Sequence, residues 1–225
     1  MSMIYIKSLL PPPVNKKEIL RYAGAKEALP ELEALLEECL TLAEDKLIYK
    51  VCYTEVCVKR NGDILTLDGI ETSSKDLQKN LAGCERAVIF AATVGLPLDR
   101  LIARFGTVAP SKALMLQAIG AERIESLCDA FNDEISKKAK AEGEATRPRF
   151  SPGYGDLPLE LQKDVFALLD CQRKIGLTLN KSLLMSPSKS VTAVIGIGKG
   201  NCNRKTGCEA CNKTDCLFRG KNENY

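Results

Sequence analysis

The chain has 225 residues and a formal net charge of +3, from 32 Lys and Arg against 29 Asp and Glu. That length is enough to bury a hydrophobic core, and the near balance of charge excludes the broad basic face of a general nucleic-acid-binding protein. No apolar stretch is long enough to cross a bilayer, and the first residues lack the layout of a secretory signal peptide. We therefore expect a cytoplasmic protein that binds neither nucleic acid nor membranes.

The N-terminal third predicts two helices followed by a hairpin. Residues 15–45 have apolar positions at helical spacing, so we expect two helices that meet near Pro30. Residues 46–60 are rich in β-branched and aromatic side chains, which is typical of a strand. The Asn61-Gly62 pair that follows favours a type I′ turn, so the next segment is expected to pair back onto this strand.

The middle of the chain predicts a central strand and a long helix. Residues 73–83 are expected to form a short Ser-capped helix. Residues 84–95 are apolar along most of their length, which is typical of a strand covered on both faces. The longest helix is expected over residues 110–143. Its apolar stripe consists of Leu116, Ile119, Ile124, Leu127, Phe131 and Ile135.

The last third predicts a loop, a helix and a final strand. The loop covers residues 146–158, the helix residues 159–176 and the strand residues 190–198. Helices and strands are mixed without a regular β-α-β alternation, which favours an α+β fold.

Loop 146–158 has the composition of a binding loop. It contains three prolines and two glycines, so its backbone is stiff and can still approach another group closely. Arg149 offers a planar fork to a carboxylate, and Tyr154 offers a flat face for stacking. Composition alone leaves open whether the loop holds a small zwitterion with an aromatic ring or only connects two elements.

Four of the ten cysteines form a cluster near the C-terminus, with the spacing C-x5-C-x2-C-x4-C. They are Cys202, Cys208, Cys211 and Cys216. The compact spacing favours a ferredoxin-like four-iron cluster, with structural zinc as the second interpretation and redox thiols without metal as the third. The other six lie singly among apolar residues and are expected in the core: Cys39, Cys52, Cys57, Cys84, Cys128 and Cys171.

The chain's excess positive charge lies on this cysteine segment. From Lys199 to the end there are six Lys or Arg against three Asp or Glu, a local net charge of +3. Such a charge suits thiolates that share a metal, and it suits docking to an acidic protein surface.

The segment RFSPGYG, which begins at Arg149, resembles a motif of the activation domain of cobalamin-dependent methionine synthase. The family has an arginine-x-x-proline-glycine-tyrosine loop, and the downstream stretch KIGLTLNKSLLMSPSKSVTAVIG is also similar to it. Upstream, KKEILRYAGAK, AVIFAATVG and LQAIGAERIESL resemble short, separately encoded versions of this domain. The resemblance covers roughly residues 15–198. It implies an activation-like domain over residues 1–198 and a four-cysteine segment over residues 199–225.

The resemblance implies a curved antiparallel sheet with surrounding helices and a site for S-adenosylmethionine. By its analogy Arg149 pairs with the carboxylate of the methionyl group, and Tyr154 lines the pocket. Ser151 and Gly153 offer backbone groups, and Glu125 lies close to the ligand, where a carboxylate offsets positive charge. A tyrosine of the family beyond the last strand and an N-terminal aspartate have no clear counterpart in this sequence.

In that family the domain supports reductive methylation of cobalamin after oxidation to cobalt(II), with an electron from a flavodoxin- or ferredoxin-like donor. The present chain has no histidine and nothing that resembles a corrinoid-binding module. We therefore expect the cobalamin on a separate methionine synthase, which this chain reactivates as its activation subunit in methionine biosynthesis. Two alternatives remain open: an activator of another corrinoid-dependent methyltransferase, and a non-catalytic interaction module stabilised by zinc.

Overall fold

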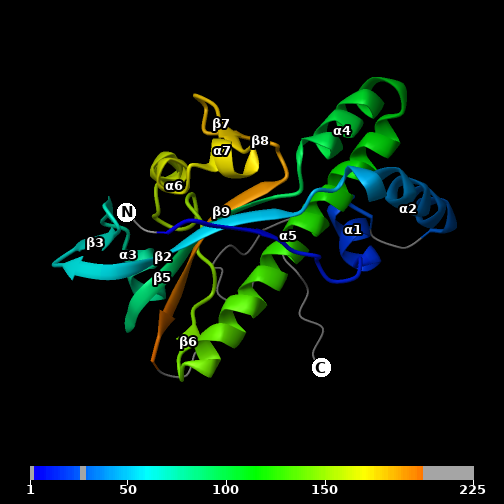
Figure 1. The fold of residues 1–225 in the computed structure, drawn as a ribbon. Helices are drawn as coiled ribbons and strands as arrows, with labels where there is room; N and C mark the ends of the chain where they lie inside the picture. The colour runs from blue at the N-terminus through cyan, green and yellow to red at the C-terminus, as the bar shows by residue number, and fades with distance from the viewer. Residues whose placement is uncertain (1–2, 26–28, 200–225) are drawn as a thin grey trace.

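The computed structural model of the chain describes residues 3–25 and 29–199 (Figure 1). Cys202, Cys208, Cys211 and Cys216, with their predicted metal or cluster, lie outside the described residues. The predicted boundary between residues 198 and 199 therefore stays a prediction. None of the described helices is both long enough and apolar enough to cross a bilayer.

An antiparallel sheet forms the centre of the fold, with strand order β4-β3-β2-β5-β9-β6 and with β1 paired to β2. Its strands are β1 (Tyr5–Ser8), β2 (Lys50–Asn61), β3 (Ile64–Leu67), β4 (Ile70–Thr72), β5 (Cys84–Thr93), β6 (Ala145–Thr146) and β9 (Ser190–Gly198). A separate hairpin consists of β7 (Thr178–Leu179) and β8 (Met185–Ser186). The long strand β2 pairs with β1 along its first four residues and with β3 along its last four.

Helices cover both faces of the sheet, so the described fold has three layers (Figure 1). The helices are α1 (Lys16–Tyr22), α2 (Pro30–Ala43), η1 (Glu44–Lys46), α3 (Lys75–Asn80), α4 (Leu96–Val108), α5 (Pro110–Ala141), η2 (Leu159–Leu161), α6 (Gln162–Leu169) and α7 (Cys171–Ile175). Helices α1, α2, α4 and α5 pack on one face, and α3, α6 and α7 pack on the other. The predicted α+β fold, an antiparallel sheet with surrounding helices, is confirmed.

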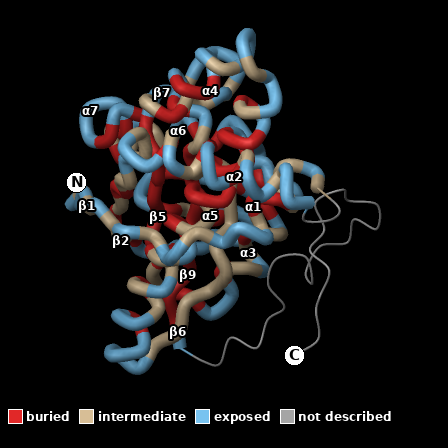
Figure 2. Tube along the Cα trace, turned by 90° about the vertical axis from the view of Figure 1, so that its right-hand side faces the viewer, coloured by how far each residue is buried: buried red, intermediate tan, exposed pale blue. Residues whose placement is uncertain are grey.

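Strand β5 shows why the core has two halves. Val88, Phe90 and Ala92 belong to the apolar cluster under α5, whereas Ile89 and Ala91 belong to the cluster under α6 and α7. Successive side chains of a strand point to opposite faces, so a strand with helices on both sides must be apolar at consecutive positions. The buried residues accordingly run through the middle of the molecule (Figure 2).

Two predicted elements differ in detail. The hairpin exists, but Asn61 pairs with Ile64, so the two-residue turn is Gly62-Asp63. Only Gly62 has a positive φ there, at 59°, as in a type II′ turn with glycine first. The helix predicted over residues 159–176 is divided at Asp170, whose φ of 49° is left-handed. Aspartate tolerates that conformation better than most residues, so the chain turns there between α6 and α7.

Five of the six scattered cysteines are buried, as predicted, but Cys57 is exposed. Cys57 lies on β2 between Val56 and Val58, whose side chains are buried in the core. Because successive side chains of a strand point to opposite faces, the side chain of Cys57 points away from the core that contains Val56 and Val58. Cys57 is therefore exposed.

The cluster of aromatic rings around Phe131 of α5 generates a first prediction. Phe131 is fully buried, with its ring centroid 5.1 Å from Tyr53 and 5.0 Å from Phe90. Phe131→Ala should lower the free energy of unfolding by about 3–5 kcal/mol, because it removes a large side chain and leaves a cavity. Phe131→Leu should cost about 1.5 kcal/mol or less, because it keeps most of the volume. Urea unfolding measures both, and equal losses for the two variants would contradict this role.

Candidate ligand-binding site

The segment predicted as a binding loop follows the open edge of β9. The backbone of Phe150 exchanges two hydrogen bonds with Val194, each 2.9 Å long, and the Arg147 amide donates to the Gly196 carbonyl over 2.8 Å. Pro148 lies between these contacts, which fits an edge position because proline has no amide to donate. The loop therefore begins as an irregular edge strand of the central sheet.

The far end of the loop is fixed to the first turn of α3 by Asp156. Its carboxylate accepts hydrogen bonds from the Lys75 amide (2.8 Å), the Asp76 amide (3.2 Å) and the Ser74 hydroxyl. The first amides of a helix lack partners within the helix, so an external carboxylate is a favourable acceptor. These contacts, the Ser74 hydroxyl first, hold the pKa of Asp156 below its ordinary value.

Between the two anchors the loop turns sharply and presents Tyr154. The Gly153 amide donates to the Leu157 carbonyl over 2.9 Å, and the Tyr154 amide donates to the Ser151 carbonyl over 3.1 Å. Gly155 has a φ of 54°, and a Cβ atom there would lie 2.4 Å from Asp76 Oδ2. Glycine is therefore required at the point where the loop passes α3. Tyr154 is 61% exposed at the apex.

Arg149 joins the loop to helix α5. One guanidinium nitrogen lies 2.6 Å from Glu125 Oε2, and the other terminal nitrogen lies 2.5 Å from Asp129 Oδ1. The Arg149 side chain is 23% exposed, Glu125 42% and Asp129 62%. Burial alone would lower the pKa of Arg149, but the two carboxylates outweigh it and raise this pKa above its ordinary value. The three charges together carry a net charge of −1.

Two tyrosines lie within electrostatic range of this charged group. The ring of Tyr154 meets Phe150 edge-on, with centroids 6.4 Å apart. Burial raises the pKa of Tyr154, and Glu125 raises it further. Tyr22, at the end of α1, is half-buried beneath the Arg21 guanidinium, 4.5 Å from the ring centroid. Burial and then Glu125 raise the pKa of Tyr22 as well. Glu125 therefore acts on phenol groups from two elements.

The structure thus brings together most of the residues predicted for the ligand. Arg149 and Glu125 form one ion pair, Tyr154 lies close enough for both charges to act on its pKa, and Ser151 and Gly153 belong to the turn that presents Tyr154. Asp129 was missed, although it follows Glu125 by four residues and so shares its face of the helix. Asp156 was also missed, since its partners lie about 80 residues away in the sequence.

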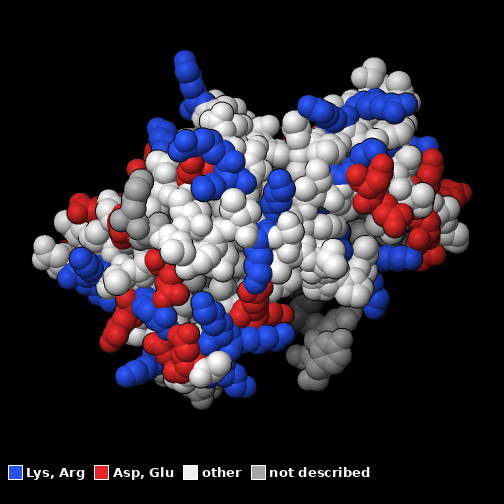
Figure 3. Space-filling view, viewed as in Figure 1, with Lys and Arg blue, Asp and Glu red and all other residues white. Residues whose placement is uncertain are grey.

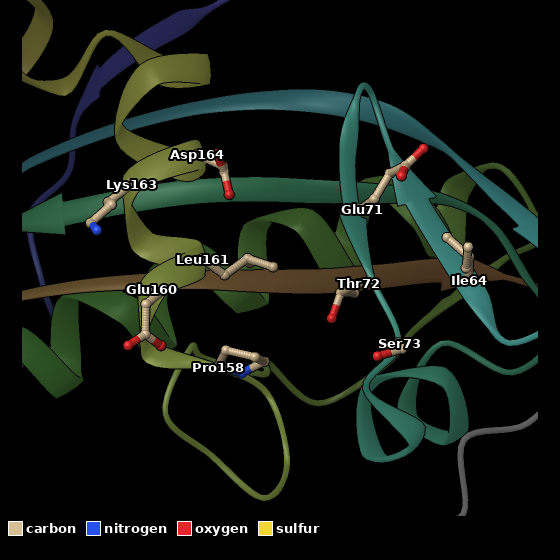
Figure 4. Close-up of a pocket in the computed structure, with 9 residues that line it drawn as sticks. All are labelled: Ile64, Glu71, Thr72, Ser73, Pro158, Glu160, Leu161, Lys163 and Asp164. Atoms are coloured by element: carbon tan, nitrogen blue, oxygen red, sulfur yellow. The ribbon is translucent and has the colours of Figure 1, made fainter.

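A groove of about 550 Å³ lies next to this loop, between β4 and the η2–α6 segment (Figure 4). Its lining residues are Ile64, Glu71, Thr72, Ser73, Pro158, Glu160, Leu161, Lys163 and Asp164. Arg149, Glu125 and Tyr154 are not among them, so the groove and the charged cluster are separate features. Elsewhere the face shown in Figure 3 mixes both signs of charge, with acidic residues gathered over α2.

Comparisons with known proteins give a consistent result. The family model of the vitamin B12 dependent methionine synthase activation domain matches residues 73–201, more than half of the chain. Among solved structures, the chain is similar to the crystal structure of the MetH reactivation domain bound to AdoHcy, with a TM-score of 0.61 and 15% sequence identity. That similarity covers 87% of this chain and 78% of the other, and it concerns the fold. No curated protein matches the chain.

The hydrogen bonds of Asp156 to the first turn of α3 generate a prediction about hydrogen exchange in the protein without ligand. In Asp156→Asn, the amide protons of Lys75 and Asp76 should lose protection against hydrogen exchange, because the acceptor loses its charge. The wild type should show the same loss on acidification. A carboxyl whose folded pKa is lowered stabilises above its unfolded pKa of about 4 and loses that contribution as pH falls through the folded pKa.

Asp133→Asn, on the exposed face of α5, is the matched control and should leave these two amides unchanged. Unchanged protection in Asp156→Asn would show that α3 is fixed without the loop.

Proposed function

Because this chain belongs to the vitamin B12 dependent methionine synthase activation domain family, we propose that it binds S-adenosylmethionine at the loop of Arg149 and Tyr154. There it supports reductive methylation of a cobalt(II) corrinoid that a separate protein carries. The observation that supports this best is the ion-pair cluster of Arg149, Glu125 and Asp129 beside the exposed Tyr154.

The charges of the cluster suit this ligand. S-adenosylmethionine carries an ammonium, a sulfonium and a carboxylate, so it needs both an anionic and a cationic partner, and Glu125 and Arg149 supply one of each. Glu125 is the anionic group that faces the cationic part of the ligand, and Tyr154 offers its ring to the adenine. Ser151 and Gly153 contribute backbone groups of the turn. The similar MetH reactivation domain binds AdoHcy, which is S-adenosylmethionine without the transferred methyl group.

Arg149 already has both terminal nitrogens in ion pairs, so the ligand's carboxylate must replace one of the two partners. Asp129 is the more exposed of the two, at 62% against 42%, and an exposed ion pair contributes only about 0.2–1 kcal/mol. The ligand's carboxylate therefore exchanges with Asp129, while Glu125 stays paired and keeps its place beside the positive charge.

The methyl transfer consumes one electron and one methyl cation. The electron reduces cobalt(II) to cobalt(I), whose electron pair forms the new cobalt–carbon bond as the sulfur–carbon bond breaks and S-adenosylhomocysteine leaves. The present chain has no histidine to supply to cobalt, so a methionine synthase or another corrinoid protein provides the corrinoid. The electron comes from a flavodoxin- or ferredoxin-like donor.

The four terminal cysteines extend this proposal. A cluster of iron and sulfur held by Cys202, Cys208, Cys211 and Cys216 would be a one-electron carrier, which is the type of carrier that cobalt(II) reduction requires. Zinc at the same thiolates would instead stabilise the segment and carry no electron.

Calorimetric titration with S-adenosylmethionine tests the site. Glu125→Gln should weaken binding by about tenfold, because it removes the charge that faces the cation. Arg149→Ala should weaken it more, since it removes the carboxylate partner and leaves Glu125 and Asp129 to repel each other. Asp129→Asn should tighten binding severalfold, because a competing carboxylate is gone.

Thermal unfolding of each variant and Asp133→Asn serve as controls for the fold and for general surface charge. Absence of binding by the wild type would favour a non-catalytic interaction module. An Asp129→Asn variant as weak as Glu125→Gln would contradict the exchange at Arg149.

Reactivation of a cobalt(II) partner by this chain, with S-adenosylmethionine and a reduced flavodoxin, tests the cysteine segment. Cys208→Ala and Cys211→Ala should slow reactivation at least tenfold while S-adenosylmethionine binding is unchanged, because only electron delivery is affected. Metal analysis of the anaerobically purified chain should find iron. One zinc per chain and no iron would exclude the electron-carrying role.

A further inference from the structure

The groove between β4 and the η2–α6 segment has an apolar base and an acidic rim. Leu161 is buried at the base, and Ile64 and Pro158 expose apolar surface beside it. Glu71 and Asp164 lie on opposite walls. With Glu160 the lining has three carboxylates against the one ammonium of Lys163. The groove therefore suits a segment that combines apolar and basic side chains.

The groove is also bordered by an open edge of the sheet. Strand β4 is the last strand of the sheet path on its side, and within residues 3–25 and 29–199 no strand pairs with its outer edge. Glu71 and Thr72 of β4 line the groove. An open edge accepts an extended segment by strand addition, so the occupant that fits is an extended chain.

The chain itself carries such a segment after its last cysteine. Residues 217–221 read LFRGK and combine two large apolar side chains with two cations. In an extended chain Leu217, Arg219 and Lys221 share one face. Arg219 and Lys221 then provide the charges that complement Glu71, Glu160 and Asp164, Leu217 provides apolar surface for the base, and Phe218 provides it on the other face of the segment. The segment is part of the C-terminal stretch with net charge +3, whereas the groove has an excess of negative charge.

The distance to the groove is short enough for this segment. A Cβ atom at Gly198 would lie 2.4 Å from the Gly83 carbonyl oxygen, so the chain leaves β9 close to the C-terminal end of α3. Ser73, which precedes the other end of α3, lines the groove. Six helical residues span about 9 Å. The 19 residues between Gly198 and residue 218 have an r.m.s. span of roughly 24 Å as a flexible chain.

We propose that this acidic groove binds residues 217–221 of the same chain. Each surface ion pair is weak, but tethering gives the segment an effective concentration in the millimolar range, so a low intrinsic affinity is enough. Bound there, the segment fastens the four-cysteine stretch at both ends: at β9 before Cys202, and at the groove after Cys216. The proposal concerns this chain's own contacts and does not depend on the metal or on S-adenosylmethionine.

Zero-length carbodiimide cross-linking of the full chain tests the proposal, since this reagent joins carboxylates to amines in direct contact. Lys221 should link to Glu71, Glu160 or Asp164 at low salt, and 0.5 M salt should reduce these links at least fivefold. Leu217→Ala/Phe218→Ala should reduce them by a similar factor although every charge remains. Glu31 and Glu33 are exposed on α2 and do not line the groove. They are therefore the reference carboxylates, and their yield measures cross-linking by general charge attraction.

A mixture of chains with natural and heavy nitrogen isotopes identifies the source of the segment. Links within one isotopic species support the proposal, and links that join the two species would assign the groove to a second copy and overturn it. Equal cross-link yields at Glu31 and at Glu160 would show that Lys221 is attracted only by general negative charge, and this result would also overturn the proposal. Methyl NMR of Ile64 gives an independent readout: its resonance should shift in Leu217→Ala/Phe218→Ala, and no shift would refute the contact.

Discussion

Strand β9 is the element on which the rest of the described structure depends. One of its edges pairs with β5 along nine residues, and its other edge pairs with β6 and with Phe150. The first pairing builds the core, because β5 is buried on both faces. The second pairing places loop 146–158 on the same rigid sheet. A loop attached to a buried strand holds its side chains in more precise positions than a free connection does.

The charged cluster depends on that attachment. Arg149 precedes Phe150, so the two hydrogen bonds to Val194 fix the backbone next to the guanidinium. From there the side chain reaches Glu125 and Asp129 on α5, which packs on one face of the sheet. Ion pairs of such exposure add little to stability. Their physical consequence is the orientation of Glu125, whose carboxylate is fixed by a partner from another layer and is still open to a ligand.

Much of the fold could be predicted from the sequence because its elements are strongly periodic. The apolar run of β5, the long stripe of α5 and the final strand β9 each contain enough residues to show their period. Asp170 could not be predicted as a break, since a left-handed aspartate between two helical segments costs little and leaves the apolar pattern intact. Strand β1 is short and exposed, and its pairing with β2 depends on residues more than 40 positions away.

In the candidate site, too, local patterns could be predicted and long-range contacts could not. Arg149 and Tyr154 could be predicted because one short motif contains both, whereas Asp156 depends on Ser74 and α3, which no local pattern connects to the loop.

The contacts of the loop with its two neighbours link the charged cluster to the acidic groove. A Cβ atom at Gly153 would lie 3.2 Å from Leu159, so the turn below Tyr154 rests on η2. The same η2 segment contributes Glu160 and Leu161 to the groove, and Pro158 at the end of the loop lines it as well. Any occupant of the groove therefore contacts the η2 segment on which the turn below Tyr154 rests. Because coupling between two binding sites is reciprocal, the factor by which an occupant of the groove changes ligand affinity at the loop equals the factor by which that ligand changes affinity at the groove.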